Sequence, residues 1–131
     1  MSLYIEITES SPGYHEVVLR GSLDTETYED FEDRITKLLE LKVKAVRIDM
    51  SCLHYLSSMG LRVLLTTFRQ LRERKALFLA AEVQPQITKV LEIAAALPEE
   101  SIFASVEEAD KYLDSIQRKV LEGDDDEDDD E

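Results

Sequence analysis

The sequence predicts a single mixed α/β domain, in which helices pack against a mixed β-sheet. The length of 131 residues gives room for one domain and not for two. Hydrophobic residues make up 44% of the chain, which is enough for a core. After an initial pair of strands, segments with strand and helix periodicity alternate, which is typical of parallel crossovers. We expect the order ββαβαβαβα within a domain of residues 1–121.

The N-terminal part of the chain predicts a hairpin and a helix. Residues 3–7 alternate apolar and polar side chains, and residues 14–20 form a second strand after a Ser-Ser-Pro-Gly turn. Residues 21–24 break this strand, and Asp24 or Thr25 can cap the following helix. The apolar positions of that helix step by three and four: Tyr28, Phe31, Ile35, Leu38 and Leu39.

The middle of the chain predicts a strand, a loop and a second helix. Residues 45–50 (AVRIDM) form the strand and residues 51–57 (SCLHYLS) form a connecting loop. Ser58 then opens a helix, whose apolar positions include Leu61, Leu64, Leu65, Phe68 and Leu71.

The remaining segments continue the alternation. Residues 76–81 (ALFLAA) are almost wholly apolar, which predicts an interior strand covered on both faces. A third helix begins at Gln84-Pro85, and residues 102–104 form a short last strand. A final helix has its apolar positions at Val106, Ala109, Leu113, Ile116 and Val120.

Negative charge is concentrated at the C-terminus. The chain has 29 acids against 15 bases, a formal charge of −14. Residues 122–131 hold nine of the acids, which leaves 20 acids against 15 bases in residues 1–121. This segment is predicted to be a disordered acidic tail, because like charges repel and bury nothing. It is either a solubilising end or a binder of a divalent cation or basic partner.

The composition also excludes several classes of protein. The acidic balance argues against a nucleic-acid groove, because phosphate backbones are bound by clustered Lys and Arg. No apolar run approaches the roughly 20 residues of a spanning helix, so no membrane insertion is expected. The single cysteine, Cys52, fits a reducing cytosol and therefore a cytoplasmic location.

Motifs of cofactor and metal chemistry are missing from the sequence. It contains no GxGxxG, no GxxxxGK[ST] and no HExxH, so we expect no bound cofactor and no metal site. Asp49, His54 and Ser58 can be drawn as a Ser–His–Asp set, but no GxSxG accompanies them. The sequence therefore indicates a non-enzymatic protein, with a small enzyme using Ser58 as nucleophile as the alternative.

The segment 46–65 carries the functional signal. Two serines, Ser57 and Ser58, stand at a helix start, where a hydroxyl oxygen can accept a hydrogen bond from a free backbone N–H. Spacing alone favours this capping role over a functional one. Gly60 in the first turn costs about 1 kcal/mol of helix propensity relative to Ala. That cost indicates close approach by another backbone or by a partner surface.

The same segment resembles the signature of the STAS family, the anti-sigma factor antagonists. In that family a strand ends in Asp-Leu-Ser, and a short loop leads to Asp-Ser-Ser-Gly-Leu or Ser-Ser-Ala-Gly-Leu before an apolar helix. Asp49 and Ser51 match the first part, and Ser58, Gly60 and Leu61 match the second. Residues 21–24 (GSLD) are similar to the family's Gly-Glu-Leu-Asp turn, and AEVQPQITKVLEIA is similar to its later loop and helix. The resemblance covers about residues 3–120.

The resemblance implies an anti-sigma factor antagonist switched by phosphorylation. In the family, the serine matching Ser58 is phosphorylated by a partner anti-sigma factor that is also a serine kinase. The unmodified domain binds this partner, and the phosphorylated domain releases it. Phosphate adds about −1.5 to −2 charges, which a helix N-terminus tolerates, so the switch acts on binding rather than on folding. This use requires the Ser58 hydroxyl to be uncovered.

Two residues depart from the family pattern. The acidic residue before the family's serine is Ser57 here, which makes Ser57 an alternative phosphate acceptor. The residue after the serine is Met59, which is larger and apolar. The candidates for partner contact around this site are Asp24, Tyr55, Leu56, Ser57, Met59, Gly60 and Arg62.

Some of these candidates also have structural explanations. Asp24 can be a helix cap instead, and Tyr55 and Leu56 can be loop residues that close over the sheet. The alternative function is a STAS interaction module without phosphorylation, such as an accessory subunit of a lipid-transport ABC system or a signalling scaffold.

Overall fold

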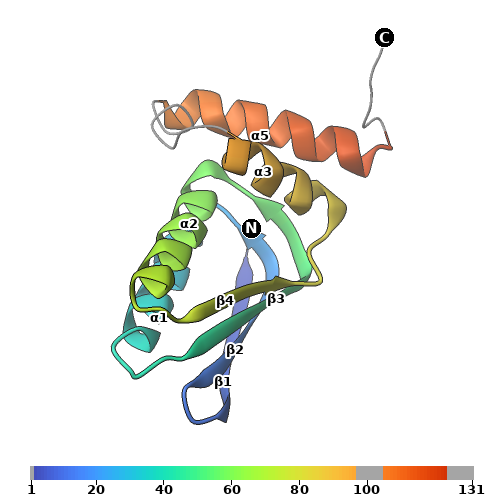
Figure 1. Cartoon of the computed structure of the whole chain (residues 1–131). Helices are drawn as coiled ribbons and strands as arrows, with labels where there is room; N and C mark the ends of the chain where they lie inside the picture. The colour runs from blue at the N-terminus through green and yellow to red at the C-terminus, as the bar shows by residue number, and fades with distance from the viewer. Residues whose placement is uncertain (1, 97–104, 124–131) are drawn as a thin grey trace.

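Four strands form one sheet in the computed structural model, which describes residues 2–96 and 105–123. The strands are β1 (Leu3–Ser11), β2 (Tyr14–Leu23), β3 (Ala45–Leu56) and β4 (Leu77–Ala81). The helices are α1 (Tyr28–Leu38), α2 (Ser58–Glu73), α3 (Pro85–Ala96) and α5 (Val106–Leu121). The strand order is β1-β2-β3-β4, with β1 and β2 antiparallel and the other pairs parallel (Figure 1). The predicted mixed α/β fold is therefore confirmed.

Two parts of the prediction reach beyond the described residues. The predicted strand 102–104 lies outside them. The predicted boundary between a domain of residues 1–121 and an acidic tail of residues 122–131 stays a prediction, because only the first two tail positions are described.

One face of the sheet is covered by α1 and α2 (Figure 1). Successive side chains of a strand point to opposite faces, so alternate residues of β2 and β3 line this covered face. Val17, Leu19 and Ile48 are fully buried there. The apolar stripe of α1 meets them through Phe31, and that of α2 through Leu61. The core of the domain lies between these two layers.

Strand β4 does not have the predicted environment. Phe78 pairs with Val46 on the covered face of the sheet. Leu77 and Leu79 belong to the other face and are 65% and 57% exposed. The prediction of an interior strand covered on both faces is therefore wrong for β4. A uniformly apolar run lacks the alternation that would have distinguished a covered face from an open one.

Both β2 and β3 extend beyond their predicted ends. The predicted loop 51–57 is strand as far as Leu56, and residues 21–24 do not break β2, which continues to Leu23. The two extensions pair with each other, because Leu23 lies opposite Leu56 in the parallel ladder. A pairing partner from another part of the chain thus satisfies backbone groups that local turn signals leave undecided.

Gly21 explains how β2 continues through a segment that looks like a turn. Its φ of +110° lies in a region that side chains rarely adopt, and the register with β3 shifts between Gly21 and Ser22. A Cβ atom at this position would lie 2.3 Å from the carbonyl oxygen of Ser2. The glycine therefore produces a bulge in the strand instead of ending it.

The entry to α1 differs from the predicted cap. The helix begins at Tyr28, and the capping position is Thr27, whose side chain makes no capping hydrogen bond. Asp24 Oδ1 accepts the N–H of Glu26 at 2.9 Å, which stabilises the turn before the helix. The prediction that Asp24 or Thr25 caps this helix is therefore wrong.

Helices α3 and α5 form a separate layer beside the end of β3 (Figure 1). Gln86 of α3 donates to the carbonyl oxygen of His54 at 3.0 Å, which ties α3 to the strand extension. Among residues 2–96 and 105–123, no helix combines the length and the apolar character needed to cross a bilayer. This second layer brings α5 to the corner between β3 and α2.

Candidate functional site

The corner between β3 and α2 begins with a helix cap. Ser57 directly follows β3, with extended φ and ψ of −89° and 174°, and its N–H donates to the carbonyl oxygen of Leu23 at 2.9 Å. Its Oγ accepts the N–H of Gly60 at 3.2 Å. This is the capping role predicted for a serine here, and Ser57 performs it. Ser57 is only 2% exposed.

Ser58 is the first residue of α2, and α5 covers it. Its Oγ donates to Asp110 Oδ1 at 2.6 Å, and its backbone N–H donates to the same oxygen at 2.9 Å. The residue has 0% of its surface exposed. The expectation of an uncovered hydroxyl is therefore wrong for this conformation. Asp110 lies 52 positions along the chain, and the pattern around Ser58 gives no signal of it.

A second polar contact holds α5 to the corner. The N–H of Leu56 donates to Gln117 Oε1 at 2.9 Å, and Gln117 Nε2 donates to the carbonyl oxygen of Leu56 at 2.7 Å. Gln117 is 1% exposed. Its amide thus pairs with the last residue of β3 as a neighbouring strand would. Sequence analysis missed this residue, although a polar side chain one turn after Leu113 on the apolar stripe was an available signal.

Gly60 is explained by the chain's own backbone. A Cβ at this position would lie 2.6 Å from the carbonyl oxygen and 2.7 Å from the Cγ of Leu23. Of the two explanations offered for this glycine, close approach by another backbone is the one the structure provides. The end of β2 and the first turn of α2 are in contact here, and Gly60 is buried between them.

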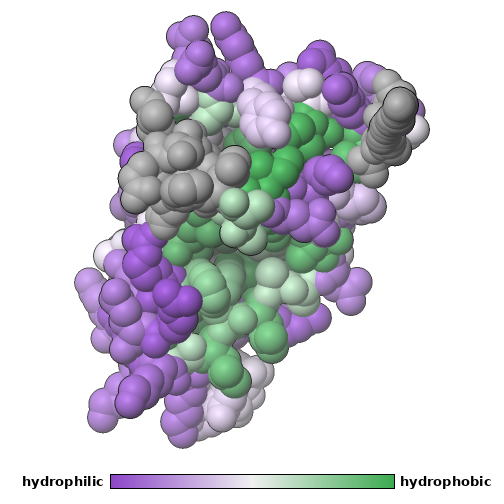
Figure 2. Space-filling view, turned by 45° about the horizontal axis from the view of Figure 1, so that its top comes forward, coloured by the Kyte–Doolittle hydropathy of each residue, from purple (hydrophilic) through white to green (hydrophobic). Residues whose placement is uncertain are grey.

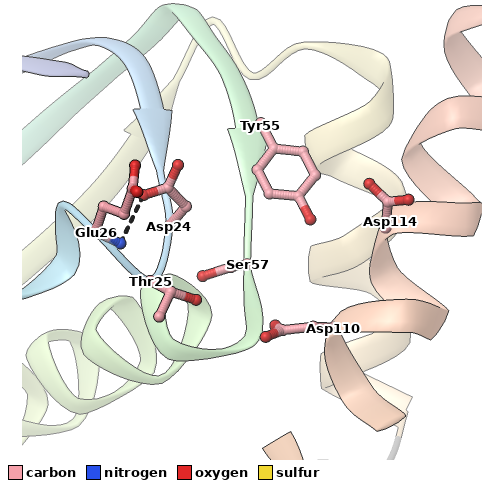
Figure 3. A pocket seen from close by; sticks show the side chains of 7 residues that line it. All are labelled: Asp24, Thr25, Glu26, Tyr55, Ser57, Asp110 and Asp114. Atoms are coloured by element: carbon pink, nitrogen blue, oxygen red, sulfur yellow. Dashed lines mark hydrogen bonds between the residues drawn. The ribbon is translucent and has the colours of Figure 1, made fainter. Parts of the chain in front are cut away.

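A depression of about 510 Å³ lies beside the two serines. Figure 3 shows its lining, with the turn after β2 on one side and α5 on the other. The lining residues are Asp24, Thr25, Glu26, Tyr55, Ser57, Asp110 and Asp114. Four of these seven residues are carboxylic acids, so the depression is strongly acidic.

Tyr55 occupies the middle of this acidic depression. Burial, followed by the charges of Asp114, Asp110 and Asp24, raises the pKa of Tyr55 to about 12. The phenol therefore stays neutral at physiological pH. It is a hydrogen-bond donor, with Asp114 of α5 as its acceptor, and not a base.

The Ser–His–Asp alternative is not assembled. The Ser58 hydroxyl is bonded to Asp110, and His54 Nδ1 lies 3.5 Å from Gln84 Nε2. Asp49 accepts the N–H of Ser51 at 2.9 Å, and this hydrogen bond lowers the pKa of the Asp49 carboxyl. These three side chains have separate partners, and this geometry does not support nucleophilic catalysis through His54. Within the described residues, no three metal-ligating side chains gather either.

The predicted contact residues differ in how much surface they offer. Arg62 is exposed, and Tyr55 and Met59 are half-buried. Asp24, Ser57 and Gly60 are buried, as is Leu56, whose exposure is 0%. Leu56 is a core residue at the end of β3, so its assignment to partner contact is wrong for this conformation. The prediction mistook the last position of a strand for a loop position.

A second concavity, of about 370 Å³, is apolar and separate from the serines. Figure 2 shows hydrophobic side chains gathered across the middle of the visible face. The concavity is lined by Met50, Leu64, Leu65, Phe68, Phe78, Ala80, Leu91 and Ala95 of β3, α2, β4 and α3. Sequence analysis placed Leu64, Leu65 and Phe68 on the apolar side of α2, and Phe68 is nevertheless 41% exposed.

Comparison with known families gives one match over most of the chain. The family model for the STAS domain matches residues 7–109. This range includes both serines and Gly60, but it ends just before Asp110 and does not reach Gln117. The two residues that fasten α5 to the corner therefore lie beyond the matched range.

A curated relative is similar over part of the chain. BtrV of Bordetella bronchiseptica (strain ATCC BAA-588 / NCTC 13252 / RB50) carries a provisional description as an anti-sigma factor antagonist. It is 30% identical over 76 residues, which are 58% of this chain and 66% of BtrV. The similarity thus spans just under two thirds of the relative's own length.

Solved structures share the fold. The anti-sigma factor antagonist SpoIIAA in its unphosphorylated form has a TM-score of 0.60 at 19% identity, over 68% of this chain and 82% of SpoIIAA. The Bacillus cell fate determinant SpoIIAA in the phosphorylated form has a TM-score of 0.61 at 17% identity, over 70% and 83%. An anti-sigma factor antagonist from Mycobacterium paratuberculosis has a TM-score of 0.58 at 22% identity, over 74% and 84%. At these identities, the likeness shows the fold alone.

Proposed function

The chain belongs to the STAS domain family, and from this premise we propose that it is an anti-sigma factor antagonist. It binds an anti-sigma factor with serine kinase activity through the corner at the start of α2. Phosphorylation of Ser58, with Ser57 as the alternative acceptor, ends that binding. The observation that carries the proposal is the corner itself, in which Ser57 caps α2 and Ser58 occupies its first turn.

The comparisons support the class of function. BtrV is described provisionally as an anti-sigma factor antagonist. Two of the structures that share the fold are of anti-sigma factor antagonists, and SpoIIAA was solved in both unphosphorylated and phosphorylated forms. A serine switch is therefore consistent with proteins that share this fold.

The local physical chemistry supports a phosphoserine at this position. The dipole of α2 and the N–H groups of its first turn favour a negative charge there, and the Asp110 carboxylate already accepts the N–H of Ser58. Tyr55, Met59 and Arg62 surround the turn and expose enough surface for a partner to contact. Ser58 is fully buried beneath α5, so its phosphorylation requires α5 to move. A phosphate there would add bulk and about −1.5 to −2 charges next to these residues, which opposes binding of a partner.

The proposal is tested with the full chain. The chain is used as bait in its native cell, and the recovered partner is purified and incubated with the chain and ATP. Mass spectrometry then maps phosphate. We expect it on Ser58, with its loss in Ser58→Ala and its retention in the matched control Ser51→Ala, because Ser51 is an exposed serine of the same segment. Absence of phosphate from both Ser57 and Ser58 contradicts the switch.

One observation favours the second candidate, an interaction module without phosphorylation. Ser58 is fully buried, and its hydroxyl is bonded to Asp110. For such a module, the same capture recovers a complex such as a lipid-transport ATPase and permease, or a signalling scaffold. The double variant Ser57→Ala, Ser58→Ala would then bind as the natural chain does, and ATP would have no effect.

A further inference from the structure

Helix α5 contributes few fully buried residues to the domain. Of its 16 residues only Leu113 and Gln117 are buried, whereas α2, of the same length, buries seven. Hydrogen bonds join α5 to the corner at Leu56 and Ser58, and a further one joins Tyr55 to Asp114. An element with few buried apolar contacts opens at a lower free-energy cost than the core does.

The Asp110 carboxylate occupies the place that suits a phosphate. Its Oδ1 accepts both the backbone N–H and the Oγ–H of Ser58, at the positive end of α2. A phosphate esterified to Ser58 Oγ removes the hydroxyl donor and competes for the same N–H. It would also lie within hydrogen-bond reach of the Asp110 carboxylate, and two such anions repel. Asp114 and Asp24 line the same depression and add to this repulsion.

We propose that α5 is a displaceable cover over Ser58, with Asp110 as its latch. In the docked state the carboxylate takes both donors of Ser58 and the helix hides the hydroxyl. The hydroxyl becomes reachable only when α5 leaves, and a phosphate on Ser58 keeps α5 from returning. The opening of α5 is a property of the chain alone. Its use in regulation rests on the proposed function.

The first experiment measures the opening without any kinase. The full chain carries Cys52→Ser and Ser58→Cys, so that its single thiol stands at the covered position. The rate of labelling by a thiol reagent then reports the population of molecules in which α5 is displaced from Ser58→Cys. Asp110→Ala is expected to raise the labelling rate about tenfold or more, because the charge-assisted hydrogen bond from the backbone N–H of residue 58 is lost. The thiol that replaces the hydroxyl is only a weak donor.

The matched control is Glu107→Ala in the same background. It removes one negative charge from an exposed residue of the same helix, whose carboxylate makes an i,i+4 ion pair with Lys111 at 3.7 Å. We expect its labelling rate to change less than about twofold, because an exposed ion pair contributes little to stability. Equal effects of Asp110→Ala and Glu107→Ala would overturn the latch, because the labelling would then follow charge alone.

Hydrogen exchange of the otherwise natural chain gives a second readout. In Asp110→Ala, peptides from α5 are expected to lose protection while those from α2 keep theirs. Loss of protection in both helices together would show general destabilisation and would overturn the proposal, as would unchanged protection of α5.

The last pair of variants isolates the charge on Ser58. Ser58→Glu and Ser58→Gln add side chains of the same length, but only glutamate brings a carboxylate against Asp110. Hydrogen exchange in α5 is expected to be faster in Ser58→Glu than in Ser58→Gln. Equal rates would contradict the proposal that a negative charge at position 58 keeps α5 from docking. None of these measurements uses a kinase. Absence of phosphate from Ser57 and Ser58 would therefore overturn the proposed function alone. An unchanged labelling rate in Asp110→Ala would overturn the latch alone.

Discussion

Helices α2 and α5 have the same length but are held in place by different forces. The seven buried residues of α2 include Leu61, Val63, Leu64 and Leu71, which pack in the core. α5 fully buries one apolar residue, Leu113, leaves Ala109, Ile116 and Val120 half-buried, and is joined to the corner by the side chains of Gln117 and Asp110. The free energy lost on separating apolar surfaces grows with the area exposed, whereas a few hydrogen bonds can be exchanged for hydrogen bonds to water. The first helix therefore belongs to the permanent fold, and the second is suited to move.

The largest expected effect is in α2. Leu61→Ala removes a fully buried side chain and should lower the free energy of unfolding by about 2–5 kcal/mol. Urea denaturation measures the loss. The control is Leu121→Ala near the end of α5, where the side chain is 64% exposed and a change within about 0.5 kcal/mol is expected. Similar losses in the two variants would break the contrast between the helices.

Gly60→Ala tests the contact between α2 and the end of β2. Helix propensity alone would favour alanine by about 1 kcal/mol. The new Cβ would lie 2.6 Å from the Leu23 carbonyl oxygen, so we expect a net loss of about 1–3 kcal/mol from overpacking. Thermal or urea unfolding shows whether the substitution lowers or raises the free energy of unfolding. A more stable variant would show that β2 and α2 are less tightly packed than the structure indicates.

Gln117→Ala tests the second clamp of α5. It leaves the buried N–H and carbonyl oxygen of Leu56 without their partner, at a cost of about 1–3 kcal/mol. The proposed opening of α5 would let water reach Leu56. The hydrogen-exchange rate should therefore increase in α5 while the rate in α2 stays unchanged. The control Arg118→Ala breaks an exposed i,i+4 pair and should cost less than about 0.5 kcal/mol. An equal increase of the exchange rate in α2 and α5 would contradict the proposal that α5 opens independently of the core.

The smallest effect concerns pH. The pKa of Tyr55 is raised to about 12 in the folded chain, against about 10 when unfolded. A raised folded-state pKa contributes stability that is present below pH ~10 and is lost as the pH rises toward 12. The natural chain should lose more stability over this window than Tyr55→Phe, as measured by urea midpoints. Both carboxylates raise the pKa of Tyr55. Asp110→Ala and Asp114→Ala should therefore each reduce the amount of stability that the chain loses between pH ~10 and 12.

Several features of the site could be predicted from local sequence. Helix-start chemistry predicted a serine cap, and Ser57 provides it. The cost of Gly60 predicted a close approach, which Leu23 makes. Other features depend on distant residues. The pairing of Leu23 with Leu56 converted a predicted break and a predicted loop into strand.

The sequence by itself determined the mixed α/β class, most of the helices and strands and the position of the serine corner, because periodicity, turn residues and capping residues act over a few positions. The tertiary structure alone decided that Ser58 is covered. That fact depends on Asp110, 52 residues away, and on Gln117, 61 residues from Leu56. The polar Gln117 on the apolar stripe of α5 signals a buried partner but not which one. The hydrogen bond between Ser58 and Asp110 leaves no periodic trace around either residue, because only the packing of α5 across the end of β3 brings them together.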